Sequence, residues 1–102
     1  VFQPGMTITD EPGVYEEGKI GIRIENELVC KEWDTTEYGR FLCFEPITYC
    51  PIDTRPVKVE LLDDAELTWL NNFHETVYRT LESSLNDRER EWLKAACAPL
   101  TR

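Results

Sequence analysis

Two glutamates near the start of the chain have the setting of a cation site. Glu11 precedes Pro12, which favours an extended backbone at Glu11, and Gly13 permits a sharp turn directly afterwards. Glu25 ends a second strand-like segment, and the region around Gly18 allows one strand to fold back on the other. Both carboxylates would then face one site, where their oxygens suit cations such as Mg²⁺ or Mn²⁺. Spacing alone still favours a purely structural role for them.

From Lys19 to Glu25, isoleucines alternate with polar residues and glycine. This segment positions the second glutamate. Its three isoleucines share one face of an expected strand, while Gly21, Arg23 and Glu25 share the other. We therefore expect an apolar core face opposite a polar face. On the polar face, Arg23 would orient a ligand that is bound at Glu25.

Period-two alternation continues through the first half of the chain and predicts an antiparallel β meander. The expected strands cover residues 7–9, 19–25, 28–31 and 41–45. Turn signals separate them at Pro12-Gly13, Glu17-Gly18, Asn26-Glu27 and Tyr38-Gly39. Three prolines from Pro46 onward then make a long regular strand improbable, which indicates an extended connector.

Two helices are expected in the last third of the chain. Asp63 and Glu66 have the spacing of a capping box, and apolar residues then recur at helical intervals. A second capping pattern at Asn86 and Glu89 precedes a shorter apolar face that must end by Pro99. This second face consists of Trp92, Leu93, Ala96 and Cys97. The predicted fold class is therefore α+β, a β meander followed by a helical hairpin.

The composition describes one small acidic domain. The chain has 102 residues, a formal net charge of −9 and 41% hydrophobic residues, which are enough to bury a core. Acidic residues are spread along the chain without a basic stripe, which argues against nucleic acid or an anionic membrane surface as a partner. No segment approaches the roughly 20 apolar residues that span a bilayer. Because the sequence opens on Val1 without an initiator methionine, we expect a fragment.

Neither the cysteines nor the single histidine has the spacing of a metal site. Cys30, Cys43, Cys50 and Cys97 are irregularly spaced and include no CxxC pair. We expect them to be reduced core thiols of a cytosolic protein. His74 has no second histidine or cysteine near it in the sequence, so a packing or helix-surface role is expected.

The two glutamate segments resemble motifs of the pita-bread metallopeptidases. Residues 5–15 contain EPGxY, and residues 18–26 contain GIRIE. This resemblance implies that Glu11 and Glu25 each ligate a dinuclear metal centre, with manganese as the expected metal. It also implies that Glu11 transfers the proton of the metal-bound water. Tyr15 and Arg23 would contact the metal ligands and orient them without binding the metal.

The rest of the chain resembles the C-terminal extension of cytosolic-type Xaa-Pro aminopeptidases, also called aminopeptidase P. The similar segments are residues 41–48, 51–52 and 69–74. The resemblance implies that residues 1–38 end the catalytic domain and that residues 39–102 form the extension. The family's other ligands, two aspartates and a histidine, would lie upstream of Val1. The chain alone is therefore expected to be inactive and to hold no metal tightly.

For the complete protein, the resemblance implies a cytoplasmic, homodimeric hydrolase that acts on peptides with proline at the second position. Three alternatives stay open. A prolidase, which is an Xaa-Pro dipeptidase, shares the glutamate motifs. In the second alternative, the helices form a dimerisation or interaction module with Trp69 or Trp92 at an interface. A relative that keeps the fold without the chemistry is the third.

Overall fold

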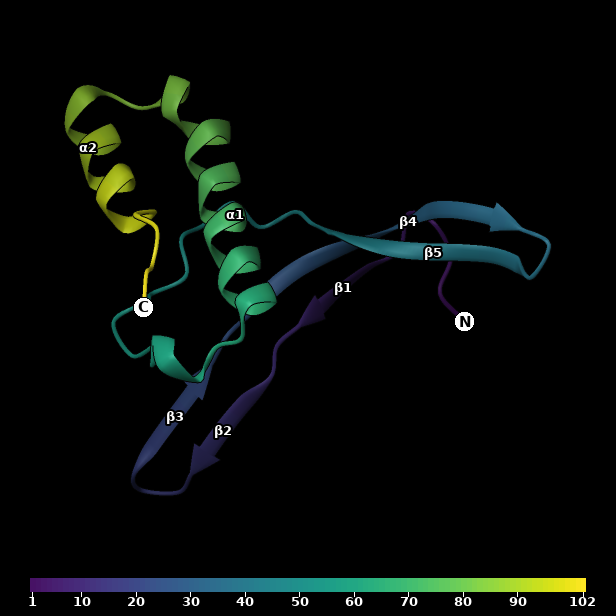
Figure 1. Ribbon diagram of the computed structural model, residues 1–102, viewed down its shortest axis with the longest axis horizontal. Helices are drawn as coiled ribbons and strands as arrows, with labels where there is room; N and C mark the ends of the chain where they lie inside the picture. The colour runs from purple at the N-terminus through teal and green to yellow at the C-terminus, as the bar shows by residue number, and fades with distance from the viewer. The chain divides into compact units, whose positions relative to one another are not determined.

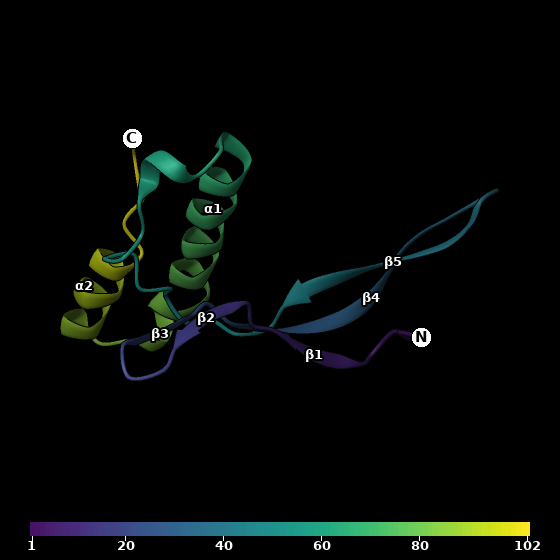
Figure 2. The same ribbon diagram turned by 90° about the horizontal axis from the view of Figure 1, so that it is seen from below.

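Antiparallel strands make up the first of two compact units in the computed structural model, which describes residues 1–102. This unit spans Val1–Thr48, and the second spans Tyr49–Arg102. The strands are β1 (Thr7–Asp10), β2 (Gly13–Glu16), β3 (Ile20–Arg23), β4 (Asn26–Thr36) and β5 (Gly39–Pro46). One sheet has the order β1-β4-β5, and β2 pairs with β3 (Figure 1, Figure 2).

A single register runs through both pairings. β1 pairs with β4 up to Asp10 and Asn26, and β2 pairs with β3 from Gly13 and Arg23 onward. The same number of residues lies between these pairs on each side of the ladder, so the register does not shift. β1 with β2, and β3 with β4, therefore act as two long strands that are each interrupted near one glutamate.

Two of the expected turns are wrong. The Ile24 N–H donates to the Pro12 carbonyl at 3.2 Å, so the ladder continues where a turn was expected at Pro12-Gly13. Proline has no N–H to donate, but its carbonyl still accepts a ladder hydrogen bond. The turn expected at Asn26-Glu27 is also absent, because Asn26 is a buried residue that begins β4.

The other two expected turns are confirmed. Residues 17–19 join β2 to β3, and residues 37–38 join β4 to β5. Gly18 and Gly39 have positive φ angles of 69° and 131°, a backbone region that glycine enters without steric cost. In β4 the register shifts between Glu32 and Asp34, which makes Trp33 the extra residue of a β-bulge.

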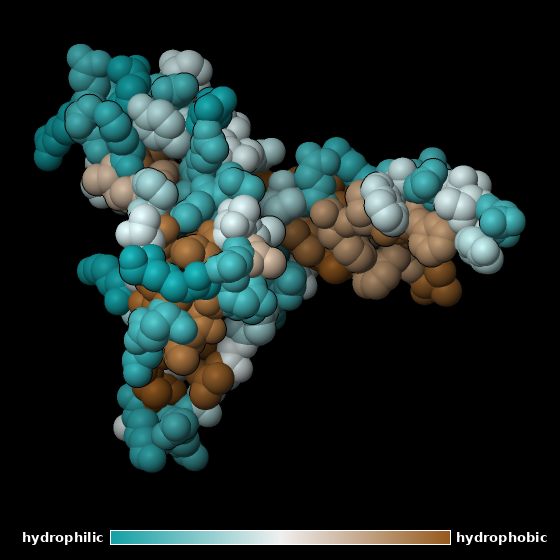
Figure 3. All heavy atoms as spheres, viewed as in Figure 1, coloured by the Kyte–Doolittle hydropathy of each residue, from teal (hydrophilic) through white to brown (hydrophobic).

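The apolar face of β3 is exposed, so the expected core face is wrong for this chain. Ile20, Ile22 and Ile24 expose 55%, 52% and 44% of their surface. Figure 3 shows hydrophobic residues at the surface over the β2–β3 hairpin. The cause is the small size of this sheet: a hairpin of two strands has no second layer of its own to cover that face.

Both predicted helices are confirmed in the second unit. α1 spans Asp64–Leu81 and α2 spans Asp87–Ala96, and the short 3₁₀ helices η1 (Val59–Leu61) and η2 (Glu82–Ser84) precede them. α1 and α2 lie side by side and antiparallel (Figure 1, Figure 2). None of the helices combines the length and apolar character that a membrane span needs.

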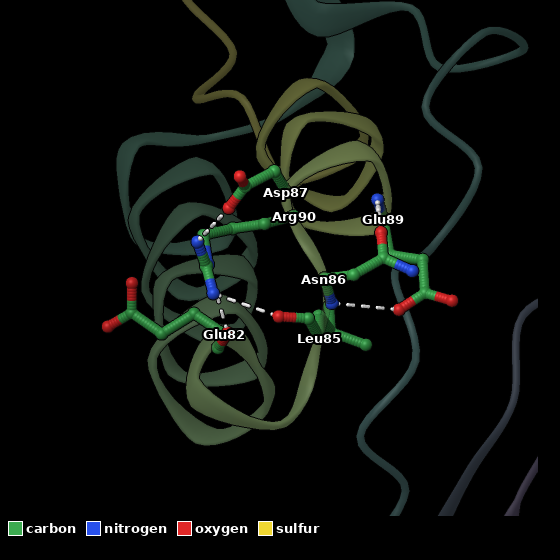
Figure 4. Close-up of polar contacts among 6 residues, drawn as sticks. All are labelled: Glu82, Leu85, Asn86, Asp87, Glu89 and Arg90. Atoms are coloured by element: carbon green, nitrogen blue, oxygen red, sulfur yellow. Dashed lines mark hydrogen bonds and ion pairs between the residues drawn. The ribbon is translucent and has the colours of Figure 1, made fainter.

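Each helix begins with the capping box that the sequence predicts. The Asp63 carboxylate accepts from the Glu66 N–H at 2.8 Å, and the Glu66 carboxylate accepts from the Asp63 N–H at 2.9 Å. Asn86 and Glu89 exchange the equivalent two bonds at 3.0 Å each (Figure 4). Loss of one such cap typically costs about 1 kcal/mol of stability.

Arg90 joins α2 to the turn before it. Its guanidinium donates to the carbonyl of Glu82 at 3.0 Å and to that of Leu85 at 2.8 Å, and it pairs with Asp87 at 3.0 Å (Figure 4). These bonds connect α2 to η2 and to Leu85 directly after it.

The core of the second unit lies between the two helices. It contains Phe73 and Val77 of α1 with Leu93 of α2 and Cys97 directly after it. Trp92, expected on the same face, is 66% exposed, so that expectation is wrong. Neighbouring residues of a helix are rotated by about 100°, which turns Trp92 away from the face of Leu93.

His74 packs inside this unit, as expected for a structural histidine. Its ring is fully buried, and its Nε2 atom accepts from the Ile52 N–H at 3.0 Å. The bond ties the connector to α1, while Nδ1 has no hydrogen-bond partner. All four cysteines are free thiols, but Cys50 is exposed, so the expectation of a core thiol is wrong there. Cys50 lies in the connector, outside both helices.

Candidate metal centre

The ladder brings together the two glutamates that the sequence singled out. Glu11 lies between β1 and β2, and Glu25 lies between β3 and β4. When the register of the Gly13–Arg23 pair is extended, Glu11 and Glu25 become direct partners. Directly opposite residues of an antiparallel pair project from the same face, with Cβ atoms about 4.5–5.5 Å apart. The two carboxylates therefore share one face of the ladder.

Arg23 and Tyr15 extend this face toward the hairpin turn. Arg23 lies opposite Gly13, and Tyr15 lies opposite Gly21. The Arg23 Nε atom is 3.1 Å from the Glu25 carboxylate. The Tyr15 hydroxyl lies close enough to this guanidinium to raise the pKa of Arg23. A continuous series of contacts thus runs from Tyr15 through Arg23 to Glu25.

The surroundings of Arg23 favour its charged form further. Its pKa is raised above the usual value, first by the hydrogen bond with Tyr15 and then by charge interactions with Tyr15, Glu25 and Glu11. The guanidinium is therefore close enough to both glutamates to offset their mutual repulsion. The side chains of Arg23 and Glu25 are 53% and 38% exposed, so water and salt weaken this effect in the chain as it stands.

The glutamate pair has the chemistry of part of a metal site. The chain holds no cluster of three or more histidine, cysteine, aspartate or glutamate side chains that would bind a metal ion. Glu11 and Glu25 offer carboxylate oxygens, which are the donors that Mg²⁺ and Mn²⁺ prefer. Both residues are exposed on one face, which leaves their oxygens open to a cation and to further ligands.

Two glycines shape this face in a way that the sequence did not reveal. A Cβ atom at Gly13 would lie 2.6 Å from the Tyr15 hydroxyl oxygen, and one at Gly21 would lie 3.1 Å from the Tyr15 Cδ1 atom. The Tyr15 ring thus lies over the space that both glycines leave free. Their alternation with Arg23 places them on one face, but it does not indicate which side chain covers them.

Comparison with known protein families matches both parts of the chain. The family described as the C-terminal region of peptidase M24 matches residues 40–100, and metallopeptidase family M24 matches residues 1–32. The chain is 44% identical over 97% of its length to aminopeptidase P1 of Lotus japonicus, and 40% identical over 98% to aminopeptidase P1 of Arabidopsis thaliana. It covers 16% of each of these relatives.

A solved structure has the same fold. The X-prolyl aminopeptidase of Caenorhabditis elegans, described as a cytosolic enzyme with a di-nuclear active site, matches 97% of the chain with a TM-score of 0.83 and 34% identity. The chain covers 17% of that protein. This likeness confirms the predicted α+β fold, in which strands of a pita-bread domain precede a helical extension. With a family match over most of its residues, the chain belongs to the M24 metallopeptidase family.

Proposed function

We propose that this chain is part of a metal-dependent aminopeptidase that hydrolyses the bond between an N-terminal residue and a following proline. The observation that carries the proposal is the placement of Glu11 opposite Glu25, with Arg23 bound to Glu25. The relatives named as aminopeptidase P, and the X-prolyl aminopeptidase with the similar fold, support the substrate class. In this proposal residues 1–38 complete the catalytic domain and residues 39–102 form the extension.

The proposed cofactors are two divalent metal ions, with Mn²⁺ as the expected metal. The di-nuclear site of the Caenorhabditis elegans enzyme supports their number. Glu11 and Glu25 would hold them, together with ligands from outside this chain's glutamate pair. When bound, such a pair of ions activates water at neutral pH and polarises the carbonyl of the scissile bond.

Each side chain of the shared face has a proposed role. The Glu11 carboxylate takes a proton from the attacking water and returns it to the leaving proline nitrogen. Glu25 acts as a metal ligand. Arg23 orients the Glu25 carboxylate and offsets the negative charge of the two glutamates. Tyr15 fixes Arg23 through its hydroxyl. Two glutamates cannot enclose two ions, so we expect the chain alone to bind metal weakly and to be inactive.

Substitution of the glutamates in the complete enzyme tests this proposal. We expect Glu11→Ala and Glu25→Ala each to lower the metal content and to reduce turnover of an Xaa-Pro-Yaa tripeptide. For Glu11 the loss of proton transfer alone predicts roughly 10²–10⁴-fold lower kcat. Metal analysis of the dialysed proteins and steady-state kinetics give the two readouts.

Glu17→Ala is the matched control, because Glu17 is an exposed glutamate in the turn between β2 and β3. It should leave both metal content and turnover unchanged. Unchanged metal and turnover in both site variants would refute the proposal. Preference for an Xaa-Pro dipeptide over the tripeptide would instead favour the prolidase alternative.

We further propose that the complete enzyme is a cytoplasmic homodimer. Trp69 and Trp92 are 49% and 66% exposed, and tryptophan is enriched among the residues that contribute most to binding at interfaces. Light scattering of the complete enzyme should give the mass of a dimer, and Trp92→Ala should weaken association by roughly 30-fold, as loss of an interface hot spot does. A monomeric wild type at high concentration would contradict this.

A further inference from the structure

Tyr15 covers two glycines that lie on its own face of the β2–β3 hairpin. Gly21 is the direct cross-strand partner of Tyr15, and Gly13 lies two residues before Tyr15 on the same strand. A Cβ at Gly21 would lie 3.1 Å from Cδ1 and 3.5 Å from Cε1 of the ring. At Gly13 it would lie 2.6 Å from the hydroxyl oxygen and 2.8 Å from Cζ. The ring therefore lies flat along the ladder, with its hydroxyl pointing toward Arg23.

Backbone torsion angles do not explain why these two positions are glycine. Positive φ angles occur at Gly5, Gly18 and Gly39, but not at Gly13 or Gly21. Any residue can adopt an extended backbone, and glycine in a strand weakens it. The Ile22 carbonyl also approaches Gly13 closely, but what both positions share is the absence of a side chain under the Tyr15 ring.

We propose that Gly13 and Gly21 form a shelf that holds the Tyr15 ring against the ladder and thereby positions Arg23 and the Glu25 carboxylate for metal binding. The inference rests on the proposed function. Tyr15 is 64% exposed, so without the shelf its ring would turn freely into solvent. On the shelf, the hydroxyl stays beside Arg23, whose Nε atom holds Glu25 at 3.1 Å. The glycines are positioning residues that act through Tyr15.

Gly21 is the better position to test. A Cβ at Gly13 would also lie 2.9 Å from the Ile22 carbonyl oxygen, so alanine there disturbs the backbone as well as the ring. At Gly21 the nearby atoms all belong to the Tyr15 side chain. Gly21→Ala should therefore displace the ring and leave the ladder paired.

The experiment compares Gly21→Ala, Tyr15→Phe and the double variant in the complete enzyme. The metal-free proteins are titrated with Mn²⁺ alone, and the dissociation constant is measured. We expect Gly21→Ala and Tyr15→Phe each to weaken Mn²⁺ binding by roughly tenfold, the lower end of the effect of outer-shell partners. In the double variant the loss should be no larger than in Tyr15→Phe, because the hydroxyl that the shelf positions is already missing. Lys19→Ala, in the exposed turn of the same hairpin, is the control and should bind Mn²⁺ like the wild type.

Wild-type affinity in Gly21→Ala, or a loss that adds in full to that of Tyr15→Phe, would overturn the proposal. A crystal structure of the Gly21→Ala protein gives a readout that requires no metal. The shelf predicts a Tyr15 ring that is displaced from the ladder, with its hydroxyl moved away from Arg23, whereas an unmoved ring would overturn it. If the wild type neither binds Mn²⁺ nor cleaves Xaa-Pro peptides, the proposed function fails, and the position of the ring still decides whether the shelf exists.

Discussion

The two units are stabilised by different kinds of interaction. In residues 49–102, five of the buried side chains come from α1 and α2: Leu70, Phe73, His74, Val77 and Leu93. In residues 1–48, only Asn26 and Cys30 are buried, and the side chains of β2 and β3 are all exposed. The helical unit is ordered by a core, whereas the strand unit is ordered by backbone pairing.

The candidate metal centre therefore lies in the unit that has fewer buried side chains. Burial of one large apolar side chain contributes about 1.5–3 kcal/mol, and an isolated two-stranded hairpin is marginally stable in water. The contacts among Tyr15, Arg23 and Glu25 are exposed and cannot replace a core. We therefore expect the face that bears the glutamates to become rigid only when its apolar side is covered.

Hydrogen exchange of the 102-residue chain gives the largest expected contrast. The amide of Val77 in the core of α1 should be protected at least roughly 10²-fold more than that of Ile22 in β3, because local opening energies range from near zero to the global value. Residue-resolved exchange measured by NMR gives both numbers in one sample. Equal protection of the two amides would show that the strand unit is as stable as the helical one.

Truncation of a core leucine sharpens the comparison within the helical unit. Leu93 is 2% exposed, and Leu93→Ala should lower the free energy of unfolding by about 2–5 kcal/mol. Leu61 is 76% exposed, and the chemically identical change Leu61→Ala should stay within about 0.5 kcal/mol. Urea unfolding followed by ellipticity at 222 nm reports this unit, because both α-helices lie in it. Similar losses in the two variants would argue against a packed core.

The smallest expected effect is a pH dependence that belongs to His74. Burial, the largest cause, lowers its pKa below the usual 6.5, so the folded state favours the neutral ring. The unfolded chain therefore binds more protons below pH 6.5, and stability should fall with the pH from there toward the lower folded pKa. The slope cannot exceed about 1.4 kcal/mol per pH unit. Well above pH 6.5 the ring is neutral in both states, and this group contributes no pH dependence.

The control for this effect is simple because the chain has one histidine. Urea midpoints of the helical unit at pH 5.5 and 7.5 should differ in the wild type and converge in His74→Gln. A wild type with the same midpoint at both pH values would show that the ring is not held neutral.

The helices were predictable because several local signals agreed. Asp63 with Glu66 and Asn86 with Glu89 mark both starts, and the apolar spacing that follows each one continues for several turns. The presence of the strands was predictable, but whether another layer covers their apolar face was not. Alternation shows that Ile20, Ile22 and Ile24 share a face, yet nothing in a local pattern shows whether another layer covers that face.

The interrupted ladder also explains what the sequence did not show about the site. Pro12 has the local signature of a turn, but its carbonyl pairs with Ile24, and this pairing is a property of two segments together. The same pairing sets Glu11 against Glu25. The turn signal and the ladder register compete at this point, and the long-range hydrogen bonds decide the outcome.

The common register also limits how the length of this region can vary. Because successive side chains of a strand alternate between faces, one residue inserted between Glu11 and Tyr15 without a bulge would place these two side chains on opposite faces. An insertion within the turn at residues 17–19 would lengthen only the hairpin tip and leave every pair in place. Loop grafting or domain insertion should therefore be tolerated better at this turn than within β2 or β3.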